Sequence, residues 1–378
     1  MKQEHRPADR TNSLTLFLCG DVMPGRGIDQ ILPHPSSPQL YEPYVRHAGD
    51  YVVLAERKYG SLPKPVDYDY IWGNALDMLA QMSPDLRIIN LETSITASNA
   101  YWRGKGINYR MHPANTPCLS AAGIDCCVLG NNHVLDWGYA GLEETLTTLH
   151  KAGIQTAGAG MTSKQAFEPA IFDLSGKGRV LVYSFGHSSS GIPPDWAARE
   201  GRAGVALLGS LSDRVVVDIA RLVHAAKRPG DIVVVSIHWG GNWGYEIPRE
   251  FRHFAHRLID EASVDLIHGH SSHHPQGIEV YRDKPIIYGC GDLLNDYEGI
   301  GGNEEFRSEL SIMYFPTMDP TTGRLLRFEL VPTLIRNFRL NRPSEKEIRW
   351  LAERMDREGR KLGTRMEFTD GDNLWLFW

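Results

Sequence analysis

Five short polar clusters carry the side chains of this sequence that could do chemistry, and each follows an apolar run. In chain order the clusters are Gly20-Asp21, Asn90-Leu91-Glu92, Gly130-Asn131-Asn132-His133, His238-Trp239-Gly240 and His268-Gly269-His270-Ser271-Ser272-His273-His274. Carboxylate, amide and imidazole groups are ligands that divalent cations such as Zn, Mn or Fe take in proteins. Because parallel strands end at one common edge of a sheet, such groups can converge there. The pattern therefore predicts a metal site.

The elements that must position these groups are strands with helices between them. Apolar runs predict strands at Leu14 to Cys19, Leu86 to Ile89, Cys126 to Leu129, Ile232 to Ile237 and Val264 to Ile267. Helical patterns cover Trp72 to Met82, Tyr139 to Ala152, Leu211 to Ala226 and Arg249 to Ala262. Alternation of strands and helices is typical of βαβ units and predicts an α/β fold.

Two long segments interrupt this alternation, and the sequence changes its character near the C-terminus. Leu32 to Asp69 and Ser188 to Arg202 are expected to be surface loops. After residue 305, Leu310 to Phe315 and Leu325 to Val331 predict an antiparallel hairpin, and Ser344 to Leu362 predicts a polar amphipathic helix. We expect a polar N-terminal tail (residues 1–13), one domain (14–340) and a C-terminal helix with an aromatic tail (341–378), with this tail docked on the domain.

Composition excludes several classes of protein. With 378 residues, 42% of them hydrophobic, the chain is long enough for a large buried core, and its net charge of −6 with scattered Lys and Arg does not suit nucleic-acid binding. No stretch of about 18 apolar residues and no apolar leader is present, so we expect a cytoplasmic protein without direct membrane insertion. The five cysteines are expected to be reduced core residues.

Taken together in order, the clusters resemble the motif series of the calcineurin-like metallophosphoesterases, and more narrowly the CapA-type family of poly-γ-glutamate capsule biosynthesis. The segments that carry the resemblance are Gly20 to Arg26, Asn90 to Ser94, Asn131 to Gly138 and Pro285 to Asp292, within residues 14 to 297. The resemblance implies a four-layer α/β/β/α sandwich, the calcineurin-like metallophosphoesterase fold, with metal at the strand ends.

What the resemblance implies for the site is one or two divalent ions, with Glu92 shared between two ligand sets. By position these sets would be Asp21, Glu92 and His273 for one ion, and Glu92, Asn132, His238 and His270 for the other. Two residues depart from the superfamily pattern: Met23 stands where an Asp-x-His motif has its histidine, and Glu92 replaces an aspartate. A site short of one imidazole favours a harder ion, so Mn, Mg and Ca stand beside Zn and Fe as candidates.

Three further residues are candidates for contact with a substrate. His133 matches the superfamily histidine that protonates a leaving group, and Asp136 has the spacing to orient its imidazole. Arg26 could bind a phosphate or carboxylate bidentately, with a surface salt bridge as the alternative. His268 and His274 lie outside the Gly-His-x-x-His pattern and are expected to support the ligands.

Each residue taken alone has a structural alternative. Asp21 could cap a helix or order a turn, Glu92 could be an ion-paired surface carboxylate, and Asn131 and Asn132 could belong to a turn. His238 could be a hydrogen-bonded core histidine. Four imidazoles within seven residues, from His268 to His274, fit metal ligation better because burying them in an apolar core would cost desolvation free energy.

The expected function is that of a metal-dependent hydrolase of the CapA-like family. Metal-activated water would attack a phosphoryl or acyl centre of a small-molecule, peptide or poly-γ-glutamate substrate, with His133 as general acid. A His–Asp pair beside a metal also suits removal of a proton from carbon, so a peptide epimerase is one alternative. A non-catalytic component of capsule polymer synthesis is another. The sequence leaves substrate, metal identity and oligomeric state open.

Overall fold

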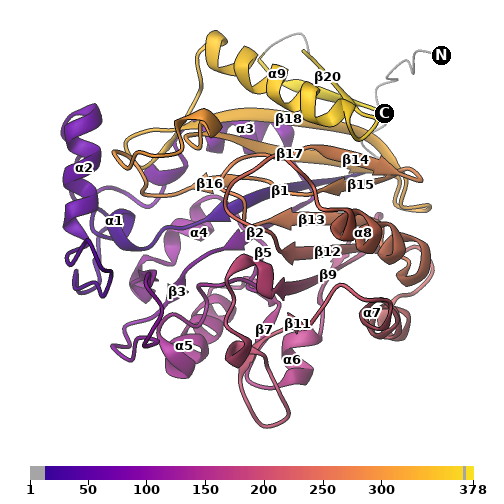
Figure 1. Cartoon of the computed structure of the whole chain (residues 1–378), viewed down its shortest axis with the longest axis horizontal. Coiled ribbons are helices and arrows are strands. Elements are labelled where there is room, and N and C mark those ends of the chain that lie inside the picture. Colours follow the sequence, from indigo (N-terminus) through magenta and orange to yellow (C-terminus); the bar gives the residue numbers. More distant parts are fainter. Residues whose placement is uncertain (1–12, 369–371) are drawn as a thin grey trace.

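The computed structural model describes residues 13–368 and 372–378, and these residues form a mixed α/β fold with two large sheets and two strand pairs (Figure 1). The α/β class predicted from the alternating pattern is therefore confirmed. Nearly all of the polar tail predicted at residues 1–13 lies outside the described residues.

The larger sheet has ten strands in the order β20-β21-β18-β17-β1-β2-β5-β6, with β16 beside β1 and β19 beside β18. Its strands are β1 (Leu14–Val22), β2 (Leu86–Leu91), β5 (Cys126–Val128), β6 (Gln155–Ala157), β16 (Asp292–Leu294), β17 (Leu310–Met318), β18 (Leu325–Ile335), β19 (Leu340–Asn341), β20 (Arg365–Phe368) and β21 (Leu374–Phe377). Strands β1, β2, β5 and β6 are parallel to one another, and β17 and β18 form the predicted hairpin.

The second sheet has seven strands in the order β11-β9-β12-β13-β15-β14, with β8 beside β9. Its strands are β8 (Ala170–Leu174), β9 (Gly178–His187), β11 (Leu207–Leu208), β12 (Ile232–His238), β13 (Leu266–His270), β14 (Ile278–Tyr281) and β15 (Lys284–Ile287). Strands β9, β12, β13 and β15 are parallel. The strand pairs are β3 (Ser94–Ile95) with β4 (Arg110–Met111), and β7 (Ala159–Gly160) with β10 (Gly204–Val205).

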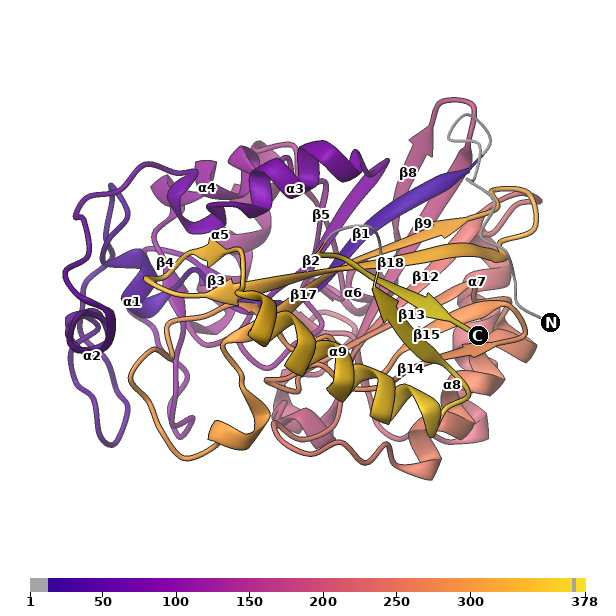
Figure 2. The same ribbon diagram turned by 90° about the horizontal axis from the view of Figure 1, so that it is seen from above.

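Helices fill most of the connections. The α-helices are α1 (Arg26–Asp29), α2 (Gly49–Tyr59), α3 (Ala75–Met82), α4 (Pro117–Ala121), α5 (Gly138–Lys151), α6 (Ser163–Phe167), α7 (Asp213–Ala226), α8 (Arg249–Ala262) and α9 (Glu345–Arg360). The 3-10 helices are η1 (Tyr70–Trp72), η2 (Pro113–Asn115), η3 (Ser188–Ser190), η4 (Pro194–Trp196) and η5 (Glu304–Phe306). Figures 1 and 2 both show α2 at the end of the molecule opposite α7 and α8.

The core divides along the two faces of the sheets because side chains alternate along each strand. Leu16 and Leu18 of β1 share one buried apolar cluster with Val182 of β9 and Val234 of β12, so this cluster joins the two sheets. Phe17, on the other face of β1, packs in a cluster with residues of α3 and α5. A third cluster packs α7 and α8 against the second sheet. Each fully buried aliphatic side chain contributes roughly 1.5–3 kcal/mol relative to exposure.

The predicted helices form with small changes at their ends. Helix α8 has the predicted bounds, and α9 begins after Ser344, whose side chain forms a capping box with Glu347. The segment from Leu32 to Asp69 differs from the expected loop because it contains α2, whose Tyr51, Val52 and Ala55 are buried on one face.

The C-terminal residues complete the larger sheet. Strand β21 pairs with β18, and the side chains of Leu374 and Leu376 are buried in the inter-sheet cluster together with Leu351 of α9. Helix α9 lies against β20 and β14 (Figure 2). The aromatic tail therefore docks on the chain's own domain. No helix in residues 13–368 or 372–378 combines the length and hydropathy needed to cross a bilayer.

Candidate metal centre

The polar clusters meet where parallel strands of both sheets end. Asp21 of β1 is the register partner of Asn90 on β2 and of Asp292 on β16, so it lies between two neighbouring strands. His238 of β12 is the register partner of His270 on β13. Because adjacent strands lie about 4.8 Å apart, this register brings one carboxylate pair and one imidazole pair together. The convergence of strand ends expected from the sequence is observed.

Two glycines let the backbone approach closely beside Asp21. A Cβ atom on Gly20 would lie only 1.6 Å from the carbonyl oxygen of Gly291, and Gly291 itself has a φ of 78°. The N–H of Asp21 donates to that same carbonyl at 3.1 Å. A larger residue at position 20 would push the two segments apart, so these glycines set the distance between Asp21 and Asp292.

A buried hydrogen-bond chain fixes the tautomer of His270. His268 Nε2 lies 2.7 Å from the carbonyl oxygen of Cys19, which can only accept, so Nε2 carries the proton. Burial lowers the pKa of His268 to about 4, which leaves its Nδ1 as an acceptor for the Ser236 hydroxyl at 3.2 Å. That hydroxyl then accepts from His270 Nε2 at 2.7 Å. His270 Nδ1 therefore presents a lone pair to the polar cluster.

His238 presents a second lone pair at the same point. Its Nε2 lies 3.1 Å from Asn132 Oδ1 and donates to it, so its Nδ1 is the acceptor nitrogen. The two acceptor nitrogens of His238 and His270 are 2.7 Å apart, and Asp21 Oδ1 lies 4.0 and 3.8 Å from them. Burial lowers the pKa of both histidines well below the ordinary value. Three electron-pair donors thus converge, and a cation is the group that would satisfy all of them.

A second group of potential ligands shares Asp21 with the first. His273 Nδ1 lies 2.9 Å from Asp292 Oδ1, and Asn295 donates to Asp292 Oδ2 at 2.7 Å. Asp21, His273 and Asp292 offer ligand atoms within 4.8 Å of one another, as do Asp21, His238 and His270. Burial opposes the charged form of His273, but the Asp292 carboxylate outweighs it and raises the pKa of His273. This group is therefore richer in charge than the first.

Asp21 is held in an electrostatically unfavourable place. Asn90 donates to its Oδ1 at 2.7 Å, whereas its buried Oδ2 has no hydrogen-bond partner among residues 13–368 and 372–378. Burial, followed by repulsion from the Asp292 carboxylate, raises the pKa of Asp21 to about 8. A divalent cation would remove both penalties, so the residues present fit such an ion.

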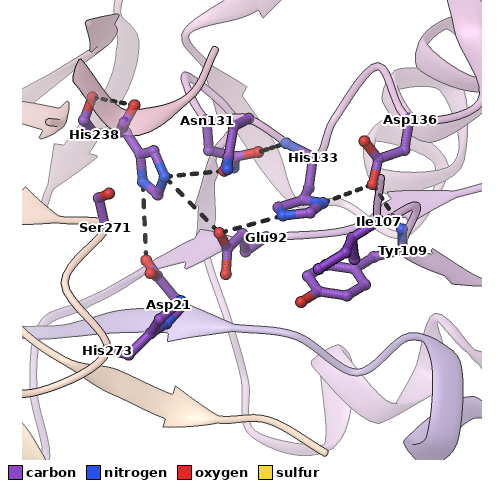
Figure 3. Close-up of polar contacts among 12 residues, drawn as sticks. Asp21, Glu92, Ile107, Tyr109, Asn131, His133, Asp136, His238, Ser271 and His273 are labelled. Carbon is purple, nitrogen blue, oxygen red and sulfur yellow. Dashed lines mark hydrogen bonds and ion pairs between the residues drawn. The ribbon is translucent and has the colours of Figure 1, made fainter. Parts of the chain in front are cut away.

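Glu92 lies between His238 and His133 in Figure 3. Its Oε1 is 3.8 Å from His238 Nε2 and 3.8 Å from His133 Nε2. Burial, followed by repulsion from Asp21, raises the pKa of Glu92 well above its usual range. Asp21, and not Glu92, is the carboxylate common to both groups described above. The bridging role predicted for Glu92 stays a prediction.

His133 and Asp136 form a close pair on the far side of Glu92 (Figure 3). His133 Nδ1 donates to Asp136 Oδ2 at 2.6 Å, and the same oxygen accepts from the N–H of Tyr109 at 2.6 Å. The Tyr109 ring stacks on the imidazole with 3.9 Å between centroids. Burial lowers the pKa of His133 to about 4. The neutral imidazole therefore points its unprotonated Nε2 toward Glu92.

Lys105 is a cation at this pair that the sequence analysis missed. Its Nζ lies 2.6 Å from Asp136 Oδ1 and 3.0 Å from His133 Nδ1, and its side chain is largely buried. Burial lowers the pKa of Lys105. The residue belongs to the irregular segment between β3 and β4, where no periodicity or motif marks it.

Arg26 lies next to the site, but carboxylates occupy its guanidinium. Asp296 accepts from Nε at 2.9 Å and from Nη2 at 2.5 Å, and Glu42 accepts from Nη1 at 2.9 Å. The guanidinium carbon also lies 3.6 Å from the centroid of the Tyr51 ring. The substrate-binding role predicted for Arg26 stays a prediction, since its donors already bind carboxylates.

The structure places three predicted ligands, His238, His270 and His273, beside Asp21, and it adds Asp292, which the sequence analysis named only as the end of the segment Pro285 to Asp292. The signal that could have identified it is the positive-φ glycine, Gly291, placed directly before an aspartate. His274 lies behind the site, where its Nε2 accepts from the N–H of Gly244 at 3.1 Å. Ser271, between two predicted ligands, has a strained φ of 108°.

A cavity of about 550 Å³ opens beside these groups. Glu92, Asn132, His133 and His273 line its inner end, and Lys105 and Tyr109 line the wall next to His133. This volume is within the range of small-molecule sites.

Comparisons with known proteins give a consistent set of relatives. The family model described as bacterial capsule synthesis protein PGA_cap matches residues 15–297. The chain is 49% identical over 368 residues to a probable polyglutamine synthesis accessory protein of Mycobacterium tuberculosis, covering 97% of this chain and 96% of that protein. It is 23% identical to the capsule biosynthesis protein CapA of Bacillus anthracis, covering 78% of this chain and 62% of that protein. A solved structure, GAP50, the anchor in the inner membrane complex of Plasmodium, covers 89% of this chain and 90% of its own at 10% identity, with a TM-score of 0.32.

Proposed function

Because this chain belongs to the PGA_cap family of bacterial capsule synthesis proteins, we propose that it is a metal-dependent hydrolase acting in the metabolism of a peptide or polyglutamate-type polymer. We also infer that its two stacked sheets and outer helices are the four-layer α/β/β/α sandwich of the calcineurin-like metallophosphoesterases. The observation that carries the proposal is the convergence of ligand atoms on Asp21, whose buried Oδ2 has no hydrogen-bond partner within the described part of the chain.

Two cations are the arrangement that these residues support best. One would be held by Asp21, His238 and His270, and the other by Asp21, His273 and Asp292, with Glu92 and Asn132 close to the first. A divalent ion bound there supplies Lewis acidity, which polarises a phosphoryl or acyl oxygen and lowers the pKa of water. The group with His238 and His270 is rich in imidazole, which suits Zn or Fe. The group with Asp292 is rich in carboxylate, which suits Mn, Mg or Ca.

The residues of the chain supply acid/base chemistry beside that site. Asp136 accepts a hydrogen bond from the Nδ1–H of His133, so the unprotonated Nε2 faces the cavity. Nε2 is then the atom that takes up a proton and gives it to a leaving group. Tyr109 fixes the plane of the ring by stacking, and Lys105 balances the charge of Asp136. The side chains of His133 and Asp136 are both buried.

The proposal is tested with tag-free protein loaded with Mn or Zn and assayed on bis(p-nitrophenyl) phosphate, p-nitrophenyl esters and γ-glutamyl peptides. We expect hydrolysis of one substrate class, its loss on chelation and its restoration by added metal. His133→Ala should lower kcat by about 100-fold or more, because it removes the proton carrier. His253→Ala, an exposed histidine on α8, is the matched control. Absence of hydrolysis of every substrate at saturating metal would contradict the proposal.

A non-catalytic accessory role in polymer synthesis is the second candidate, and it is favoured by the similarity to the probable polyglutamine synthesis accessory protein of Mycobacterium tuberculosis. In that case the ion would be structural. Chelation would then lower the melting temperature of the protein while no substrate class is turned over in either state.

A further inference from the structure

The cavity beside the metal centre changes its character along its length. Its inner end is polar, where Glu92, Asn132 and His273 face it. Toward solvent, the lining includes two exposed aliphatic side chains, Ile107 and Ile300, which are 41% and 50% exposed. These two residues come from separate segments, one between β3 and β4 and the other between β16 and β17, and both line the same cavity.

Aromatic rings join the polar end to this apolar mouth. Tyr109 stacks on His133, and its hydroxyl lies 2.7 Å from that of Tyr297. The Tyr297 ring meets His273 edge-on at 5.3 Å, and Trp243 lies 5.3 Å from the same imidazole. All three aromatic residues line the cavity. A ligand that extends outward from the inner end of the cavity would therefore lie along these aromatic side chains before it reaches Ile107 and Ile300. Figure 3 shows Ile107 with Tyr109 and the His133–Asp136 pair.

The charges of the lining do not suit a polyanion in this outer part. Arg26 and Lys105 are already bound by carboxylates. Lys58 remains at the rim, 5.2 Å from the centroid of the Tyr59 ring. Against this one cation stand the carboxylates of Glu298 and Glu304, since Glu309 is paired with Arg307. A ligand with repeated carboxylates would meet like charge here, whereas an apolar group would cover exposed apolar surface.

We propose that the outer cavity binds an apolar or aromatic group of the substrate, so that the substrate class is a small molecule or peptide with one anionic reacting centre and an apolar group next to it. This inference rests on the proposed hydrolase function, because it takes the reacting centre to lie at the inner, polar end of the cavity. Ile107 and Ile300 are then specificity-determining residues that contact the substrate away from the reacting atoms.

The test is calorimetric binding to the full-length, Mn-loaded protein of two phosphonates with the same anionic head. Benzylphosphonate carries an aromatic group, and methylphosphonate lacks it. Tri-γ-glutamate is the third probe, since it carries repeated carboxylates. We expect benzylphosphonate to bind about tenfold or more tightly than methylphosphonate, as burial of an aromatic ring requires. Tri-γ-glutamate should bind more weakly than benzylphosphonate.

Substitution of the two isoleucines at the cavity mouth tests whether they cause the difference between the phosphonates. The double variant Ile107→Ser, Ile300→Ser should reduce the difference between the two phosphonates to about threefold or less, while methylphosphonate binds as in the wild type. Leu326→Ser on β18 is the matched control, because Leu326 is 40% exposed and does not line the cavity. A melting curve of each variant checks that it is folded.

Equal binding of the two phosphonates, binding of neither, or tighter binding of tri-γ-glutamate would each overturn the inference. Failure of the hydrolase proposal is seen separately, as absence of turnover in protein that still binds benzylphosphonate preferentially. Conversely, turnover by protein that binds both phosphonates equally would leave the hydrolase proposal standing and remove the apolar subsite.

Discussion

The two ligand groups that share Asp21 differ in how the protein controls charge. In the group with His238 and His270, burial keeps both imidazoles neutral, and a relay through Ser236 and His268 turns the lone pair of His270 toward Asp21. In the group with His273 and Asp292, the ion pair outweighs burial and favours the charged imidazole. One site thus offers neutral nitrogen donors, and the other offers carboxylates. Under the proposed function, neighbouring strand ends would thus hold two unlike cation sites around one carboxylate.

The largest effect should come from the residue that both groups share. Asp21→Asn keeps the shape of the side chain but removes its charge, so both groups lose their common ligand. We expect cation affinity and any hydrolytic rate to fall by more than about 100-fold, since removal of a mere supporting partner already costs 10–100-fold. Elemental analysis of tag-free protein measures the metal content. Retention of wild-type metal content in Asp21→Asn would mean that the two groups do not depend on this carboxylate.

Substitution of one ligand in each group should show that the two groups prefer different metal ions. His270→Ala should weaken Zn binding by a factor on the order of 100, and Asp292→Asn should weaken Mn binding to a similar degree, because imidazole suits the softer ion and carboxylate the harder one. Competition titrations with a fluorescent chelator measure both affinities. The matched controls are His253→Ala and Asp218→Asn, whose side chains are 67% and 47% exposed. If both variants weakened the same ion equally, the distinction between the groups would be lost.

Above pH 6.5, the pH dependence of the stability of the chelated protein should come from the groups whose pKa values are raised. A carboxyl group with a folded pKa of about 8, as at Asp21, binds its proton more tightly when folded, so its stabilising effect is lost as pH rises from about 4 to 8. The raised pKa values of His273 and Glu92 act in the same direction. The lowered pKa values of His238 and His270 affect stability only below about 6.5.

Between pH 6.5 and 8.5 the melting temperature of the chelated wild type should therefore fall by about 2 °C or more. Asp21→Asn should remove most of this slope. A melting temperature that rises with pH over this interval in chelated wild-type protein would show that Asp21 is not held in the protonated form.

The smallest effect concerns Lys105, which adjoins neither group directly. Lys105→Met removes the cation that balances Asp136, so the pKa of His133, which Lys105 helps to lower, should rise. The acid limb of the pH–rate profile for kcat/KM should move to higher pH, with a change of less than about tenfold at neutral pH. Lys164→Met, on the exposed surface of α6, is the control. A profile displaced toward lower pH would exclude this role.

Much of this arrangement could be predicted from the sequence because it depends on strand ends. The apolar runs before Asp21, Glu92, His238 and His270 become parallel strands, and parallel strands bring their following residues to one edge. The match to the PGA_cap family confirms the predicted family. Helix α9 follows from its amphipathic pattern and its Ser344 cap.

The rest depends on contacts between residues far apart in the chain. Asp292 becomes the neighbour of Asp21 only because Gly20 and Gly291 permit their backbones to approach closely. Arg26 pairs with Asp296, 270 residues away, in a buried salt bridge, where the sequence allowed either anion binding or a surface salt bridge. Lys105 reaches Asp136 from an irregular segment that no periodic pattern describes.

The most direct test of two cation sites around Asp21 is a crystal structure of Mn-loaded, tag-free protein, with anomalous difference maps measured at the Mn edge. The account predicts one peak among Asp21, His238 and His270 and a second among Asp21, His273 and Asp292. A structure with no anomalous peak at Asp21, or with Mn bound only elsewhere on the protein, would contradict it.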